Sequence, residues 1–194
     1  VLGSASPRRK MILSDYFSQI KIIHPSIDET PLNCESPENF AERISREKMR
    51  SVEEELPGYG NYIAVTADTI VTIDGLILGK PESVSRAVDM LSLLSGREHR
   101  VVTGVTVCIR KSDTVNESTS MESTAVLFKK LSIGEINRYI KLVDCMDKAG
   151  AYAVQEHGDM LIESITGSLT NVIGFPLRLF FSLLCSNDAM DFLL

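Results

Sequence analysis

The most informative segment of the chain is Val1-Leu2-Gly3-Ser4-Ala5-Ser6-Pro7-Arg8-Arg9-Lys10. Two apolar residues lead into small ones, and then Ser6 and Pro7 suit the N-cap and the first turn of a helix. That helix opens with consecutive cations, which the helix dipole disfavours by about 0.3–1 kcal/mol each. An anion bound by the free backbone N–H groups and the arginines would remove this conflict, and a phosphate chain fits. The stretch therefore predicts strand, loop and helix, with Ser6, Arg8 and Arg9 as candidate phosphate-binding residues.

The overall composition is that of a globular protein, with 194 residues, 44% hydrophobic and 24% charged. A net charge of −6 argues against a protein that coats nucleic acid. No apolar run approaches the ~20 residues of a membrane helix, and no signal-peptide pattern opens the chain. The four cysteines lie far apart without a CxxC pair, so we expect reduced thiols rather than a zinc or redox site. These features predict a cytoplasmic protein with neither a nucleic-acid nor a membrane partner.

Strands and helices intermix along the chain. Asp74-Gly75 between two apolar runs predicts a hairpin, and Ser132-Ile133-Gly134-Glu135 predicts a helix capping box. Because several neighbouring strands are joined by short turns, we expect a mixed sheet flanked by helices rather than a purely parallel one. The expected strands are 20–23, 62–67, 69–73, 76–78, 100–110, 118–129, 149–155 and 160–165, and the expected helices are 7–17, 36–49, 84–94, 132–143 and one that begins at 176.

Two carboxylates and two lysines are candidates for chemistry. Asp68 is expected at the end of a buried strand, where it either faces a cleft or forms a turn. Glu29 lies in the Pro-bounded loop 25–31, Lys48 in a charged helix, and Lys80 between a glycine and a proline. By default Glu29 and Lys48 are surface charges. Taken together, lysines that hold phosphates and carboxylates that hold a divalent cation predict phosphoanhydride cleavage.

The remaining residues of the sequence give weaker indications of function than these lysines and carboxylates. Gln155 follows a run of small residues, where its amide either contacts a base edge or caps a turn. The three histidines have no metal-ligand spacing, and the sequence has no P-loop, no GxGxxG and no nucleophile elbow. The common nucleotide-binding and serine-hydrolase signatures are therefore absent.

Six motifs in order resemble the signature of the Maf family of nucleotide pyrophosphatases, also called septum formation proteins. They cover nearly the whole chain, so the resemblance implies a single domain over residues 1–194. It also implies a mixed α/β fold similar to inosine triphosphate pyrophosphatases, with an elongated sheet flanked by helices and two lobes around a central cleft. The motifs are Ser4-Ala5-Ser6-Pro7-Arg8-Arg9, Arg46-Glu47-Lys48, Ala67-Asp68-Thr69-Ile70-Val71, Gly79-Lys80-Pro81, Asp147-Lys148-Ala149-Gly150-Ala151-Tyr152, and Gly167-Ser168 with Asn171-Val172 and Gly174-Phe175-Pro176.

The resemblance implies an enzyme that hydrolyses a nucleoside triphosphate to the monophosphate and pyrophosphate. It assigns proton acceptance to Asp68 and a divalent cation (Mg²⁺, Mn²⁺ or Co²⁺) to Glu29 and Asp68. It further implies a homodimer. The phosphate-binding positions of the family correspond to Arg8, Lys48 and Lys80. The pattern at the start of the first helix adds Ser6 and Arg9 to these candidates. The alternative for Arg9 is that it anchors the loop and does not contact the substrate.

Three positions bear on the choice of base. Arg8, Thr69 and Gln155 match the branch that acts on dTTP and UTP, whereas the branch that acts on 7-methyl-GTP has Trp, Gln and Glu at the corresponding places. The sequence departs from the family pattern at Glu156, because in the family a glycine usually follows the glutamine that corresponds to Gln155. The alternatives are a pyrophosphatase for 7-methyl-GTP or another modified nucleotide, and a nucleotide-binding regulator of septum formation.

Overall fold

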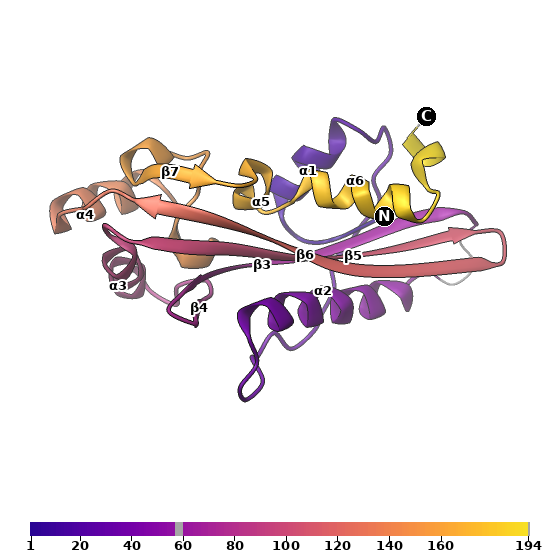
Figure 1. Cartoon of the computed structure of the whole chain (residues 1–194), viewed down its shortest axis with the longest axis horizontal. Coiled ribbons are helices and arrows are strands. Elements are labelled where there is room, and N and C mark those ends of the chain that lie inside the picture. The colour runs from indigo at the N-terminus through magenta and orange to yellow at the C-terminus, as the bar shows by residue number, and fades with distance from the viewer. Residues whose placement is uncertain (57–59, 194) are drawn as a thin grey trace. The chain divides into compact units, whose positions relative to one another are not determined.

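The computed structural model describes residues 1–56 and 60–193, which form two compact units (Figure 1). Unit 1 comprises Val1–Asp68, Thr103–Glu122 and Gly174–Leu194, and unit 2 comprises Thr69–Val102 and Ser123–Ile173. Three long strands contribute residues to both units, namely β3 (Tyr62–Ile73), β5 (Glu98–Lys111) and β6 (Thr114–Phe128).

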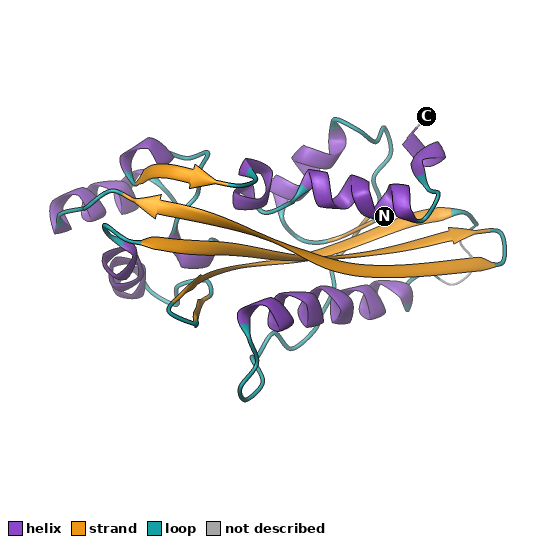
Figure 2. Cartoon of the chain, in the orientation of Figure 1, coloured by secondary structure: helices purple, strands orange, loops and turns teal. Residues whose placement is uncertain are grey.

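The strands form one mixed sheet in the order β2-β1-β3-β5-β6-β7, with β4 paired to β3 (Figure 2). In unit 1 the first strand runs parallel to β2 and to β3, while in unit 2 β4 and β7 run antiparallel to β3 and β6. This arrangement confirms the expected mixed α/β class. The four short strands are β1 (Leu2–Gly3), β2 (Ile22–Ile23), β4 (Leu76–Leu78) and β7 (Ile162–Thr166).

The helices begin where the sequence places their caps. Ser36, Ser83 and Ser132 each accept a hydrogen bond from a backbone N–H of the first turn, and Ser132 and Glu135 form the predicted capping box. Unit 1 contains α1 (Pro7–Ser14), α2 (Pro37–Glu53), α6 (Leu177–Ser186) and the 3-10 turn η3 (Met190–Leu193). Unit 2 contains α3 (Val84–Leu94), α4 (Ile133–Leu142), α5 (Leu169–Ile173), and the 3-10 turns η1 (Ala149–Ala151) and η2 (Gly158–Met160). Within the described ranges, no helix has the length and apolar character to cross a membrane.

In unit 1, α2 lies along one face of the strands, and α1 and α6 lie on the other (Figure 1). The approach of α2 to β5 is very close, because a Cβ atom built on Gly104 would lie 2.2 Å from the carbonyl oxygen of Ala41. Beneath α2 a small apolar cluster fills the remaining space with Ile23, Met49, Val52, Leu56, Ala64 and Cys108. The glycine in β5 therefore fixes the distance between the helix and the sheet.

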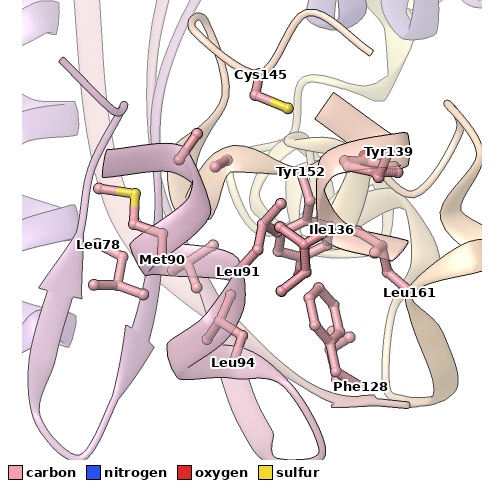
Figure 3. Packing of buried hydrophobic residues seen from close by; sticks show 14 of the residues in the cluster. Leu78, Met90, Leu91, Leu94, Phe128, Ile136, Tyr139, Cys145, Tyr152 and Leu161 are labelled. Carbon is pink, nitrogen blue, oxygen red and sulfur yellow. The ribbon is translucent and has the colours of Figure 1, made fainter. Parts of the chain in front are cut away.

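Unit 2 has a larger core between its helices and strands (Figure 3). Helix α3 packs against α4 and η1. The labelled side chains include Leu91 and Leu94 from α3, Ile136 and Tyr139 from α4, and Phe128 from β6. Leu78 and Tyr152 belong to this core, so a buried side chain lies two or three residues before Lys80 and before Gln155.

His99 is enclosed in this core. It is 2% exposed, its ring packs edge-on against Phe128 and Tyr152, and its Nε2 lies 2.8 Å from the Tyr152 hydroxyl. Burial lowers the pKa of His99 from 6.5 to about 4. The native state therefore keeps a neutral imidazole at a pH where the unfolded chain binds a proton.

This lowered pKa predicts a loss of stability in mild acid. Well above pH 6.5 both states hold a neutral His99, so the penalty is absent, and it grows as the pH falls through 6.5 toward 4. Between pH 7.5 and 4.5 we expect the free energy of unfolding to fall by about 2–3 kcal/mol more in the wild type than in His99→Gln. Urea unfolding at both pH values measures this, with His24→Gln, at an exposed position, expected to behave as wild type. An equal fall in wild type and His99→Gln would contradict the prediction.

Two expectations about strands need correction. Residues 62–67 and 69–73 form one strand, β3, so Asp68 lies inside a strand rather than at its end. A carboxylate is tolerated there because a lysine pairs with it, as described below. The expected strand 149–155 is wrong, because Gly150 and Ala151 have φ angles of 66° and 63° and form the 3-10 turn η1. Left-handed backbone at two successive residues is incompatible with an extended strand.

Candidate active site

The centre of the candidate site is an ammonium group held by two carboxylates in unit 1. Lys48 Nζ lies 2.7 Å from Asp68 Oδ1 and 2.8 Å from Glu29 Oε1. The Lys48 and Asp68 side chains are 12% and 10% exposed, whereas that of Glu29 is 52% exposed. The structure thus brings together three of the residues that the sequence singled out, and it places Lys48 in a half-enclosed ion pair rather than on a solvated helix face.

Short polar contacts fix the helix that carries Lys48. One turn before this lysine, the Ser45 carbonyl accepts a hydrogen bond from Thr66 Oγ1 at 2.6 Å, which ties α2 to β3. Ser45 Oγ lies 2.9 Å from Thr106 Oγ1, which ties α2 to β5. All three residues are buried, so these bonds are shielded from water. Lys48 and Asp68 are therefore presented to each other by a well-fixed helix and strand.

Arg9 is buried beside this ion pair. Its Nε donates to the Gly174 carbonyl at 2.9 Å, and its Nη1 donates to Ser4 Oγ at 3.1 Å. Burial lowers the pKa of the Arg9 guanidinium, while the negative charges of Asp68 and Glu29 act in the opposite direction. These contacts join the start of α1 to the segment before α6, which is the geometry expected of a loop anchor.

Ser6 and Arg8 mark the start of α1. Ser6 occupies the N-cap position, but its side chain makes no cap hydrogen bond, and its backbone N–H donates to Ser4 Oγ at 3.1 Å. Arg8 is half-buried in the first turn. Its positive charge repels that of Arg9 and so acts to lower the pKa of the Arg9 guanidinium. The first turn of α1 begins at Pro7 and contains no acidic residue. The basic side chains there are therefore unfavourably placed relative to the helix dipole, as the sequence predicted.

The remaining candidates, Thr69, Lys80 and Gln155, belong to unit 2. Thr69 follows Asp68 directly in β3. Lys80 is exposed and follows Gly79, whose carbonyl accepts a hydrogen bond from the Gly150 N–H at 3.1 Å. Gln155 is exposed in the turn 154–157. Tyr139 holds the chain just before that turn, since its hydroxyl accepts from the Ala153 N–H at 3.0 Å.

Sequence reasoning missed the role of Lys148. Its side chain is 5% exposed, and its Nζ donates to the Asp144 carbonyl at 2.5 Å and to Asp147 Oδ1 at 2.7 Å. It also lies 3.4 Å from Glu156 Oε1, so the carboxylate next to Gln155 is paired with a buried cation. The one feature of the sequence that could have drawn attention to Lys148 is its place in the motif Asp147-Lys148-Ala149-Gly150-Ala151-Tyr152.

The carboxylates of Glu29 and Asp68 fit a divalent cation in one respect. Each places an oxygen within 2.8 Å of one atom, Lys48 Nζ, so the two carboxylates lie near each other on either side of that ammonium group. Over residues 1–56 and 60–193, no group of three or more His, Cys, Asp or Glu side chains is arranged to hold a metal. A metal there would take its other ligands from water and from substrate phosphates, which is the usual pattern for Mg²⁺.

Comparisons with known proteins show what this chain is similar to. Residues 1–187 match the family described as Maf-like protein. A dTTP/UTP pyrophosphatase of Clostridioides difficile is 41% identical over 177 residues, which is 91% of this chain and 89% of that protein. A dTTP/UTP pyrophosphatase of Syntrophomonas wolfei is 39% identical over 183 residues, 94% of each protein. Among solved structures, a nucleoside-triphosphatase / dITP/XTP pyrophosphatase of Mycobacterium abscessus aligns with 97% of this chain and 94% of its own, with a TM-score of 0.42 and 13% identity.

Proposed function

The chain belongs to the Maf family, and on that basis we propose that it hydrolyses dTTP and UTP to the nucleoside monophosphate and pyrophosphate. The substrates are suggested by relatives of about 40% identity that align over nine-tenths of the chain. The observation that carries the chemistry is the convergence of Glu29 and Asp68 on Lys48. An activity at the α-phosphorus requires both cationic phosphate contacts and a carboxylate base, and this group of residues supplies both.

In this mechanism a divalent cation (Mg²⁺, Mn²⁺ or Co²⁺), when held by Glu29 and Asp68, neutralises phosphate charge and acidifies water. Asp68 accepts the proton of the water that attacks the α-phosphorus. Arg8, Lys48 and Lys80, assisted by Ser6 at the helix start, bind the triphosphate and balance the charge of the leaving pyrophosphate. Arg9 contributes indirectly, since its bonds to Ser4 and Gly174 hold the loop in place.

We further propose that residues 1–194 act as a single catalytic domain, because the match to the Maf family covers residues 1–187. We assign the protein to the cytoplasm, since all four of its cysteines are unpaired, as in a reducing compartment. We also propose a homodimer, as the family resemblance implies.

The test is a panel of nucleoside triphosphates incubated with Mg²⁺, Mn²⁺ or Co²⁺, with release of pyrophosphate as the readout. The panel contains the canonical ribo- and deoxynucleotides, 7-methyl-GTP and modified pyrimidine nucleotides. We expect dTTP and UTP to have the highest kcat/KM, with no turnover in EDTA. Release of orthophosphate instead of pyrophosphate, or a preference for 7-methyl-GTP, would overturn the proposal.

Gln155 is proposed to select the base through its side-chain amide, which can both donate and accept hydrogen bonds. Gln155→Glu removes the donor and adds a charge, so we expect the ratio of kcat/KM for dTTP over 7-methyl-GTP to fall about tenfold or more. Glu156→Gln is the matched neighbour, and we expect a smaller change because Lys148 already neutralises Glu156. Steady-state kinetics with both nucleotides measure the ratio, and an unchanged ratio in Gln155→Glu would remove this residue from base selection.

A further inference from the structure

The loop that carries Glu29 is tied to α2 at two points. At one, Glu29 Oε1 contacts Lys48 Nζ at 2.8 Å. At the other, the carbonyl of Thr30, the next residue, accepts a hydrogen bond from Arg43 Nη2 at 3.0 Å. Arg43 and Lys48 are five residues apart on α2, which places them roughly 7.5 Å apart along the helix axis. Both attachments of the loop therefore come from a single rigid element.

Arg43 is itself held by a two-pronged bond to Glu35. Its Nε donates to Glu35 Oε1 at 2.7 Å, and its Nη2 donates to Glu35 Oε2 at 2.8 Å. The Glu35 side chain is 8% exposed, and the hydrogen bonds from Arg43 lower the pKa of its carboxyl. Glu35 Oε2 also accepts from the Leu32 N–H at 3.0 Å. Arg43 and Glu35 together thus bind the backbone at Thr30 and at Leu32.

The loop adds an internal bond that stiffens the residues around Glu29. Asp28 Oδ1 accepts from the Thr30 N–H at 2.9 Å and from Thr30 Oγ1 at 2.6 Å. This turn fixes the chain on both sides of Glu29, whose own side chain is half-exposed. The direction of the Glu29 carboxylate therefore depends on where Thr30 is held.

We propose that Arg43 is a positioning residue that, through the Thr30 carbonyl and Glu35, holds Glu29 in the orientation that lets it share a divalent cation with Asp68. This inference deepens the proposed function and rests on it for the identity of the reaction. Arg43 touches neither substrate nor metal, and its effect is on metal affinity. A lysine cannot replace it, because a single ammonium group lacks the planar guanidinium that reaches Glu35 and Thr30 together.

The test compares Arg43→Lys and Glu35→Gln with the control Glu47→Gln. Glu47 accepts from Arg43 Nη1 at 3.1 and 3.2 Å, whereas Nε and Nη2 hold Glu35 and Thr30. The control therefore removes an ion pair of the same arginine and leaves the loop attached. Three quantities are measured: Mn²⁺ binding to the protein without nucleotide by electron paramagnetic resonance, the Mn²⁺ concentration that half-activates dTTP hydrolysis, and amide hydrogen exchange at Thr30 and Leu32.

For Arg43→Lys and Glu35→Gln we expect about tenfold weaker Mn²⁺ binding and about tenfold higher half-activation, as is typical when a partner of a metal ligand is lost. At saturating Mn²⁺, kcat should stay within about threefold of wild type. Exchange at Thr30 and Leu32 should accelerate, and Glu47→Gln should match wild type throughout. A purely structural role would lower the melting temperature and leave the metal constants unchanged.

Wild-type metal constants in Glu35→Gln, an equal loss in Glu47→Gln, or no Mn²⁺ binding by the wild type would each overturn the proposal. If Arg43→Lys fails to fold, Glu35→Gln, a near-isosteric change, decides the outcome. If the wild type binds Mn²⁺ but hydrolyses no nucleotide, the proposed function fails, while Mn²⁺ binding and hydrogen exchange still decide the role of Arg43.

Discussion

Asp68→Asn is expected to fold normally and to lose turnover of dTTP and UTP by about 10²–10⁴-fold, the usual contribution of a general base. Asparagine has the shape of aspartate, but it cannot accept the proton of the attacking water, and it is a poor ligand for a hard cation. Because the side chain is 10% exposed and faces Lys48, solvent does not readily supply a substitute base. Single-turnover and steady-state assays of pyrophosphate release, with saturating metal, measure the loss.

The matched control is Asp89→Asn on α3, which removes a carboxylate of an exposed ion pair with Arg86. We expect this variant to keep wild-type kinetics, because exposed pairs contribute little to stability. Thermal melting of both variants separates loss of chemistry from loss of fold. Wild-type turnover in a folded Asp68→Asn protein would show that another group accepts the proton.

Gly104→Ala is expected to cost about 3 kcal/mol in the free energy of unfolding. The added Cβ would lie 2.2 Å from the Ala41 carbonyl oxygen and 2.4 Å from its carbon, so it meets the backbone of α2 rather than a flexible side chain. Relief requires α2 to move away from β5, and that movement carries Lys48 with it. We therefore expect reduced activity in the fraction that remains folded. Urea unfolding followed by circular dichroism measures the stability.

Gly60→Ala is the corresponding control, since a Cβ there meets no atom within 4 Å. Its free energy of unfolding should stay within about 0.5 kcal/mol of wild type, as for most surface substitutions. If Gly104→Ala were as stable as Gly60→Ala, the close approach of α2 to β5 would not be what fixes the helix.

Features set by neighbouring residues were predicted well. The helix start at Ser36, the capping box at Ser132 and the hairpin at Asp74-Gly75 all occur as expected. Each depends on side chains and backbone angles within a few positions, so tertiary contacts do not override them. The segment 149–155 was predicted wrongly because its small apolar residues suit a strand, whereas the backbone of Gly150 and Ala151 is left-handed in the fold. A Cβ on Gly150 would lie 2.9 Å from Val71 Cγ2.

Lys48 shows the limit of local reasoning about the site. Its helix carries several charges, and the default interpretation was a solvated face. In the structure it is a nearly enclosed cation between two carboxylates, one from a loop and one from a strand. Similarly, nothing near Arg43 in the sequence indicates that it binds the backbone beside Glu29.

Local sequence patterns predicted the class of fold and the order of its main elements, and the six motifs predicted the family and the kind of chemistry. The position of Lys48 between Glu29 and Asp68, and the residues that hold them there, became visible in the folded chain. The reason is physical: periodicity and capping act over a few residues, whereas the Lys48–Asp68 contact joins positions 20 residues apart. Such a contact forms only once α2 is packed on the sheet, at the distance that Gly104 permits.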